Sequence, residues 1–191
     1  MARPRSVEDN ELLDAAMTAF WADGYGGVST RALEQATGLP ASSLYHRYGS
    51  KEGLFVAVLA HYIVRVIAGR AQRYLAADDA AAGLRAFFTS VYRQGGRPYR
   101  ACLLANTWQE LHTRLPAVTT ELARGRQLLL AAFAANLRRG IDSGAWRAGL
   151  DVAVAADFLF LSLQGLLAAA RGERDPARLD AQVDFMLGAL R

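Results

Sequence analysis

STRALEQATGLPASSLYHRYGSKEGL, residues 29–54, is the stretch that decides the fold predicted for this chain. Ser29 is a suitable helix cap, because its hydroxyl can accept a hydrogen bond from a free backbone N–H of the first turn. Leu33 and Ala36 follow three residues apart, which places them on one apolar face of a helix. The stretch therefore begins with a short helix that packs through this face.

The next residues predict a turn and a second short helix. Gly38 can adopt the left-handed conformation that ends a helix, and Pro40 fixes the backbone at the entry of the next one, over about residues 40–45. Two such helices joined by a glycine-containing turn form a helix-turn-helix, whose second helix enters the major groove of DNA. Ser50 then caps a long third helix that begins at Lys51.

Two longer pieces of sequence make this interpretation specific: GYGGVSTRALEQATGLP, residues 24–40, and SSLYHRYGSKEGLF, residues 42–55. In order and spacing they resemble the DNA-binding domain of the TetR (tetracycline-repressor-like) family, and the resemblance is strong over about residues 8–60. It implies a homodimeric transcriptional regulator with a small-molecule inducer site. We therefore predict a repressor that a small apolar or amphipathic molecule releases from a two-fold operator.

The second short helix, the reading helix, carries hydroxyl and imidazole groups that can bond base edges or phosphates. The resemblance places Tyr45 and Lys51 on phosphates and positions 41–43 near bases. It places Thr30 and Arg31 near the DNA backbone. The DNA-binding residues predicted in this way are Thr30, Arg31, Ala41, Ser42, Ser43, Tyr45, His46, Arg47 and Lys51.

Three residues depart from the usual pattern of the family. Pro40 stands where Ser or Thr usually caps the reading helix, Ala41 where Lys is frequent, and Arg47 where His is frequent. Pro40 and Ala41 remove a cap and a cation, and Arg47 can restore the charge. Leu44 and Tyr48 are expected to point inward and hold the reading helix in place.

Charge alone does not identify a DNA-binding protein here. The chain of 191 residues carries a net charge of +4, which suits a polyanionic partner. Residues 1–51, however, hold five basic against six acidic residues. DNA binding must therefore rest on the placement of a few cations.

Helix-forming residues dominate, led by Ala, Leu and Arg, so we predict an all-α fold of about nine helices. The first helix is expected over residues 6–23, and the fourth, over 51–77, is shared by both modules and can transmit a shift between them. Residues 1–50 would form the DNA-binding domain, and residues 51–191 a helical ligand-sensing and dimerisation domain. The later helices, several of them capped by Asp (Asp78-Asp79, Asp151 and Asp175), are expected over about residues 80–94, 101–112, 116–142, 151–171 and 176–191.

The last two predicted helices hold more apolar surface, Leu161 included, than an outer helix pair needs. Paired across a two-fold axis they would form a four-helix bundle, and the resemblance implies the same dimer. Packing of this surface within one chain is the alternative. Residues 152–170 are long enough for a membrane span, but Asp157 and Gln164 favour a buried interface helix. The predicted interface residues are Phe158, Leu159, Leu163, Leu166, Val183, Met186, Leu187 and Leu190.

The fourth to seventh helices are expected to leave a ligand cavity with aromatic walls and a few polar groups, the usual lining of a small-molecule pocket. An aromatic residue at a core-facing position is more often core than pocket, whereas a buried Asn106 or His112 needs a partner. Cys102 is either a reactive thiol or an inert buried one. The predicted ligand-binding residues are Tyr62, Phe88, Tyr92, Cys102, Asn106, Trp108, Gln109, His112, Phe133 and Phe158.

The sequence holds no HExxH, GxSxG or P-loop motif, and its single cysteine excludes an intrachain disulfide, so we expect no enzyme, metal or cofactor. Residues 1–6 lack the apolar core of a signal peptide, so we expect a cytoplasmic protein. Two alternatives stay open: a constitutive DNA-binding protein without an inducer, and a helical small-molecule-binding protein or enzyme with a vestigial DNA head.

Overall fold

The computed structural model describes residues 5–93, 102–111, 114–173 and 175–191. These residues form nine α-helices and three short helical segments, with no strand among them, which confirms the predicted all-α fold. The α-helices are α1 (Arg5–Gly27), α2 (Thr30–Thr37), α3 (Ala41–Tyr48), α4 (Lys51–Tyr62), α5 (Ala80–Ser90), α6 (Leu103–Leu111), α7 (Thr119–Asp142), α8 (Val152–Ala169) and α9 (Pro176–Gly188). The short segments are η1 (Ile63–Ala68), η2 (Ala71–Leu75) and η3 (Pro116–Val118).

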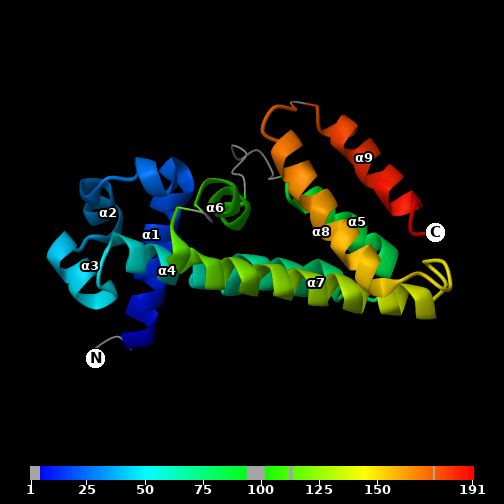
Figure 1. The fold of residues 1–191 in the computed structure, drawn as a ribbon, viewed down its shortest axis with the longest axis horizontal. Helices are drawn as coiled ribbons and strands as arrows, with labels where there is room; N and C mark the ends of the chain where they lie inside the picture. Colours follow the sequence, from blue (N-terminus) through cyan, green and yellow to red (C-terminus); the bar gives the residue numbers. More distant parts are fainter. Residues whose placement is uncertain (1–4, 94–101, 112–113, 174) are drawn as a thin grey trace.

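The helices are arranged along one long direction (Figure 1). Helices α1, α2 and α3 gather at one end, and α8 and α9 lie at the other. Helix α4, continued by η1 and η2, runs beside α7 between the two ends. Helix α6 packs on α1, α4 and α7, so it touches both the N-terminal head and the helices behind it.

Predicted caps are confirmed at five helix starts, because each depends on residues that are neighbours in sequence. In every case a serine or aspartate oxygen accepts a hydrogen bond from a backbone N–H of the first turn. The pairs are Ser29 with Ala32 (3.1 Å), Ser50 with Gly53 (3.0 Å), Asp79 with Ala82 (2.9 Å), Asp151 with Ala153 (2.9 Å) and Asp175 with Ala177 (2.9 Å).

The predicted end of the first helix near residue 23 is confirmed, because Gly24, with a φ of 71°, is not helical, and a short helical stretch then continues α1 to Gly27. Other predicted boundaries are wrong. The reading helix α3 extends to Tyr48 instead of ending near residue 45. The long helix is π-helical over η1 and η2, and such turns are frequent at functional sites. Helix α5 ends at Ser90.

The core behind the head is built on aromatic rings from α5 and α7. Phe87 and Phe133 meet edge-on with ring centroids 5.3 Å apart, and Phe88 stacks on Phe133 at 5.8 Å. Next to them the fully buried Asn136 donates hydrogen bonds to the carbonyl oxygens of Ala80 (3.0 Å) and Leu75 (3.4 Å). Sequence reasoning missed Asn136, which ties the end of η2 to the start of α5.

Two helical stretches, Lys51–Leu75 and Val152–Ala169, are long and apolar enough to cross a membrane by length and composition. This is weak evidence, because the core helix of a soluble protein passes the same test. Half of the Lys51–Leu75 window is buried inside the molecule. This buried half packs on the head and on α7.

Candidate DNA interface and ligand cavity

The reading helix α3 has one buried face and one exposed polar face. Leu44 is 1% exposed and packs into the head, as predicted, and Tyr48 is half-buried. The side chains of Ser42, Ser43 and His46 are exposed on the other side. The head therefore presents hydroxyl and imidazole groups to solvent over a fixed apolar base.

Helix α2 supports this arrangement through Leu33, which is fully buried. Ala36 is exposed, so the predicted pairing of Leu33 and Ala36 on one buried face is wrong. The inward face of α2 is centred on Leu33 and includes the half-buried Ala32 and Thr37, so Ala36 lies just outside it. Thr30 and Arg31 are exposed at the start of α2, and the Thr30 hydroxyl lies 3.3 Å from the hydroxyl of Tyr45.

A carboxylate replaces the cap that Pro40 cannot supply. The backbone N–H of Ala41 donates a 2.7 Å hydrogen bond to Glu34 Oε1, seven residues earlier in α2. Pro40 itself makes no side-chain cap. The expected loss of the cap at the reading helix is therefore wrong, and Glu34 fixes α3 to α2 with a charge that suits a helix N-terminus.

Two of the three cations predicted to bind DNA, Lys51 and Arg47, already have partners within the head. Lys51 Nζ donates to the carbonyl oxygen of Val28 at 2.6 Å and lies 5.0 Å from the centre of the Tyr25 ring. An ammonium has three N–H groups, so Lys51 keeps donors for a phosphate. Arg47 forms an ion pair with Asp9 of α1, which offsets the charge it was expected to restore.

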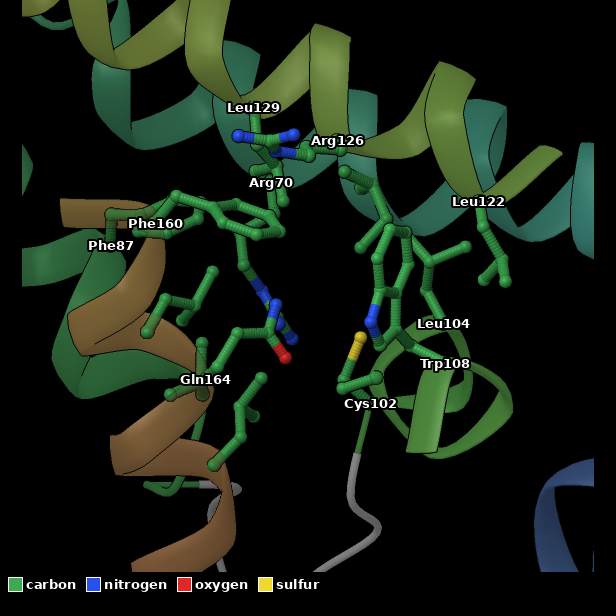
Figure 2. A pocket seen from close by; sticks show the side chains of 15 residues that line it. Arg70, Phe87, Cys102, Leu104, Trp108, Leu122, Arg126, Leu129, Phe160 and Gln164 are labelled. Carbon is green, nitrogen blue, oxygen red and sulfur yellow. The ribbon is translucent and has the colours of Figure 1, made fainter. Parts of the chain in front are cut away.

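An apolar cavity lies between the long helix, α6, α7 and α8 (Figure 2). Its walls include Phe87, Leu104, Leu122, Leu129 and Phe160, and its volume is only about 30 Å³. Trp108 of α6 and Cys102, the residue just before α6, approach the cavity from one side, and Gln164 of α8 approaches it from another. Such a volume holds about one water molecule, so the side chains of the walls largely fill the space.

The polar groups of this cavity are few. Arg70 and Arg126 contribute guanidinium groups, and Gln164 contributes an amide. Next to the cavity the buried Tyr62 hydroxyl donates to Cys102 Sγ at 3.4 Å. Burial, with the neighbouring Cys102, raises the pKa of Tyr62 well above its ordinary value, so this phenol stays protonated. Among the described residues no group of three His, Cys, Asp or Glu side chains could hold a metal ion.

The structure brings only two of the predicted ligand-binding residues, Cys102 and Trp108, to this cavity. Phe88 and Phe133 are fully buried in the aromatic core, and Tyr92 bonds Asp180 of α9. The remaining predicted residues also lie away from the cavity or outside the described part of the chain. Tyr62 is buried behind Cys102, Asn106 binds Arg171, and Gln109 is exposed. Phe158 lies on α8 facing α9, and His112 lies outside the described residues. Sequence reasoning missed Arg70, Arg126, Phe160 and Gln164, which no local pattern distinguishes.

Helices α8 and α9 form an apolar groove of about 390 Å³ on the outer side of the molecule. Phe185 is 82% exposed and Leu161 68% exposed, with Val154 and Phe158 also open to solvent. Monomers rarely expose such a contiguous set of large apolar side chains unless it is an interaction site. Phe185 and Val154 were not predicted as interface residues.

Most of the predicted interface residues instead face the interior of their own chain. Only Phe158 and Met186 have substantial exposed area in the groove. Those buried within the chain are Leu159, Leu163, Leu166, Val183, Leu187 and Leu190. The apolar helices therefore divide their residues between the core and an outer face, as amphipathic helices do.

Comparison with known families covers nearly the whole chain. Residues 12–58 match the family described as bacterial regulatory proteins, tetR family. Residues 58–186 match the tetracyclin repressor-like C-terminal domain. The first match contains α2, α3 and the capped start of α4, and the second contains the cavity and most of the outer groove.

Two curated relatives show how far the similarity extends. The HTH-type transcriptional repressor ComR of Escherichia coli is 38% identical over 90 residues, 47% of this chain and 43% of ComR. That match spans less than half the length of either protein. The HTH-type transcriptional repressor AcnR of Corynebacterium glutamicum is 25% identical over 181 residues, 95% of this chain and 91% of AcnR.

A solved structure extends the comparison to the fold. A cysteine-substituted form of the TetR-family regulator CifR, in complex with 26-base-pair double-strand operator DNA, is 31% identical with a TM-score of 0.82. The match covers 99% of this chain and 100% of that one. Regulators of this family are dimers that bind operator DNA and small molecules, and they are generally cytoplasmic. The chain therefore belongs to the TetR family and is a DNA-binding transcriptional regulator rather than an enzyme.

Proposed function

We propose that this protein is a cytoplasmic repressor that occupies a two-fold operator as a homodimer and leaves it when a small molecule enters the cavity. The observation that carries the proposal is the exposed polar face of α3, held on a buried Leu44 and capped by Glu34. Such a face can bond base edges and phosphates without rearrangement of the head. The repressor relatives named above support the sign of the control.

We assign the DNA contacts to exposed and half-buried positions of the head. Ser42, Ser43 and His46 would face base edges, while Tyr45 and Lys51 would bind phosphates. The contacts proposed at the edge of this surface are Thr30, Arg31, Ala41 and Arg47. One head supplies few base contacts, so two heads about 34–36 Å apart on one face of the DNA would give specificity. The outer groove of α8 and α9 supplies the surface for this dimer.

Helix α6 is the element best placed to connect the cavity to the head. Leu104 and Trp108 of α6 line the cavity. On its other side α6 lines a second, more polar cavity of about 330 Å³ against Gly24 and Tyr25 of α1. A ligand that displaces α6 would change how α1 is held, and it releases DNA only if it binds the two conformations with different affinity.

A constitutive regulator without an inducer is the second candidate, and the cavity volume favours it. About 30 Å³ is far below the roughly 300 Å³ of pockets that hold drug-sized ligands. Ligand entry must therefore move side chains of the cavity wall. A ligand screen that gives no thermal shift, with DNA binding intact, would select this candidate.

The first test is fluorescence anisotropy with the DNA immediately upstream of the protein's own gene, at physiological salt, against unrelated DNA. We expect at least about a thousandfold preference for the upstream DNA, as specific regulators show. Equal and weak binding to that DNA and to a pool selected from random sequences would contradict the proposal. The same titration, repeated with candidate ligands, then measures release.

Position 41 offers a direct test of how α3 meets the DNA. The variant Ala41→Lys adds one cation at the first turn of α3, so we expect tighter binding and a steeper salt dependence. Each new phosphate contact should add about 0.9 to the slope of log affinity against log salt. Ala41→Gln, which has similar length without the charge, is the control. An unchanged slope in Ala41→Lys would show that position 41 does not face the DNA backbone.

A further inference from the structure

We infer that the cavity selects a hydrophobic monocarboxylate, whose carboxylate pairs with the guanidinium of Arg70. This inference rests on the proposed function, since it names the ligand class of the proposed inducer site. Arg70 reaches from the long helix into the cavity and approaches Gln164 of α8 (Figure 2). A guanidinium and an amide thus meet inside walls that are otherwise mostly hydrocarbon.

The side chains that line this cavity carry a net positive charge. Its lining, among the described residues, contains Arg70 and Arg126 and no Asp or Glu. Arg126 has a partner outside the lining, because its Nη2 donates to Asp157 Oδ1 at 3.0 Å. Arg70 is in none of the ion pairs formed among the described residues. A half-buried guanidinium in apolar surroundings is stabilised by an anion, so the site favours a negatively charged ligand.

The charges of the lining also predict that the ligand carries a single negative charge. Arg126 is already paired with Asp157, and its guanidinium also lies 5.6 Å from the centre of the Phe160 ring. Of the cations that line this cavity in the described part of the chain, Arg70 alone is then left to neutralise a ligand. A carboxylate matches one planar guanidinium with two parallel hydrogen bonds. A phosphate dianion would bring a second charge into an apolar cavity, which is costly without a second partner.

The backbone around Arg70 supports a functional position. Arg70 lies between the π-helical segments η1 and η2. Such turns change the direction of the side chains that follow them, and they are frequent at ligand sites. Ile67, three residues before Arg70, lines the same cavity. The irregular helix therefore aims a hydrocarbon and a cation into one space.

The apolar part of the ligand would lie among the wall residues of α5, α7 and α8, where Phe87, Leu129 and Phe160 meet. The cavity must widen for this, because its volume is about 30 Å³. Arg70 lies beside Gln164 on the α8 side of this space, and Trp108 lies beside Cys102 on the α6 side (Figure 2). Their displacement by a ligand would also shift α6, which is the movement that the proposed release requires.

The test uses ligands that share one apolar body and differ in the head group. Isothermal titration calorimetry with full-length protein compares the even-numbered carboxylates from butanoate to decanoate with the alcohol, primary amide, amine and phosphate monoester of the same chain. We expect the best carboxylate to bind at least about tenfold more tightly than its amide and its alcohol. The amine should bind most weakly, because it would lie beside Arg70.

Arg70→Met keeps the length of the side chain and removes its charge, so it should abolish the preference for the carboxylate over the amide. Arg73→Met is the matched control, since Arg73 is exposed on η2 and its guanidinium lies over the Tyr74 ring. This control should keep the preference. Arg70→Lys should keep part of it, because the charge remains without the planar fork.

Three results would overturn the inference: equal or tighter binding of a neutral or cationic member, an unchanged preference in Arg70→Met, or no binding by any carboxylate of the series. Operator binding measured by anisotropy without ligand separates these results from failure of the proposed function. If operator binding is intact, DNA binding stands and the ligand class is wrong, and the ligand screen described above then decides whether the regulator has an inducer at all. If it is absent, the proposed function fails, and the calorimetric preference still decides the ligand class.

Discussion

Phe185→Glu is expected to convert the protein into a monomer and to weaken operator binding by at least about a hundredfold. Phe185 is the most exposed large apolar side chain among the described residues, at 82%. In a two-fold dimer each interface residue is used twice, so one substitution places two charges in the interface. A carboxylate that is buried there without a partner costs several kcal/mol per charge.

The loss of DNA affinity follows from the loss of the dimer. A single head retains its phosphate contacts and binds DNA weakly and without sequence preference. Two linked heads gain affinity because the second binding event becomes intramolecular. The monomeric variant should therefore bind operator and unrelated DNA alike, with an unfolding midpoint close to that of the unmodified chain, because Phe185 makes little contact within its own chain.

Sedimentation and anisotropy at the same protein concentration check this prediction. Gln72→Glu is the control, because it adds one negative charge at an exposed position of η2, away from α8 and α9. It should stay dimeric and bind the operator normally. If Phe185→Glu is still a dimer with full operator affinity, the interface lies elsewhere on the molecule.

Helix caps and the dimer interface differ in how well the sequence predicts them. The predicted caps are correct because each needs only residues that are close in sequence, such as Ser29 and Ala32. The α3 cap was missed because Glu34 reaches Ala41 across the turn, through tertiary structure. A periodic apolar pattern identifies α8 and α9 as amphipathic, but it does not say which side faces the chain's own core.

The cavity could not be read from the sequence for a related reason. Arg70, Gln164 and Trp108 come from three helices, and only the crossing of those helices brings them together. An aromatic residue looks the same in sequence whether it fills the core, as Phe133 does, or lines a cavity, as Phe160 does. Local patterns therefore predict elements well and predict sites only where one element carries the whole site, as α3 does.

Leu44→Ala is expected to abolish specific DNA binding without removing any group that touches DNA. Leu44 is 1% exposed beneath the reading helix. Truncation of a buried leucine removes favourable transfer free energy and leaves a cavity, at a cost of about 2–5 kcal/mol. The head is small, so a loss of this size can unfold α3 locally while the rest of the chain stays folded.

Ser43→Ala is the matched control, because Ser43 is the exposed neighbour of Leu44 on the same helix. It should change the free energy of unfolding by less than about 0.5 kcal/mol while reducing operator preference, since a base contact is worth about 1–3 kcal/mol. Urea denaturation and anisotropy measure the two quantities separately. A Leu44→Ala protein with full operator preference would show that Leu44 does not anchor the reading helix. A Ser43→Ala protein that keeps the full preference for the operator would show that other positions of α3 recognise the bases. A side chain that only faces solvent contributes neither to the free energy of unfolding nor to operator preference.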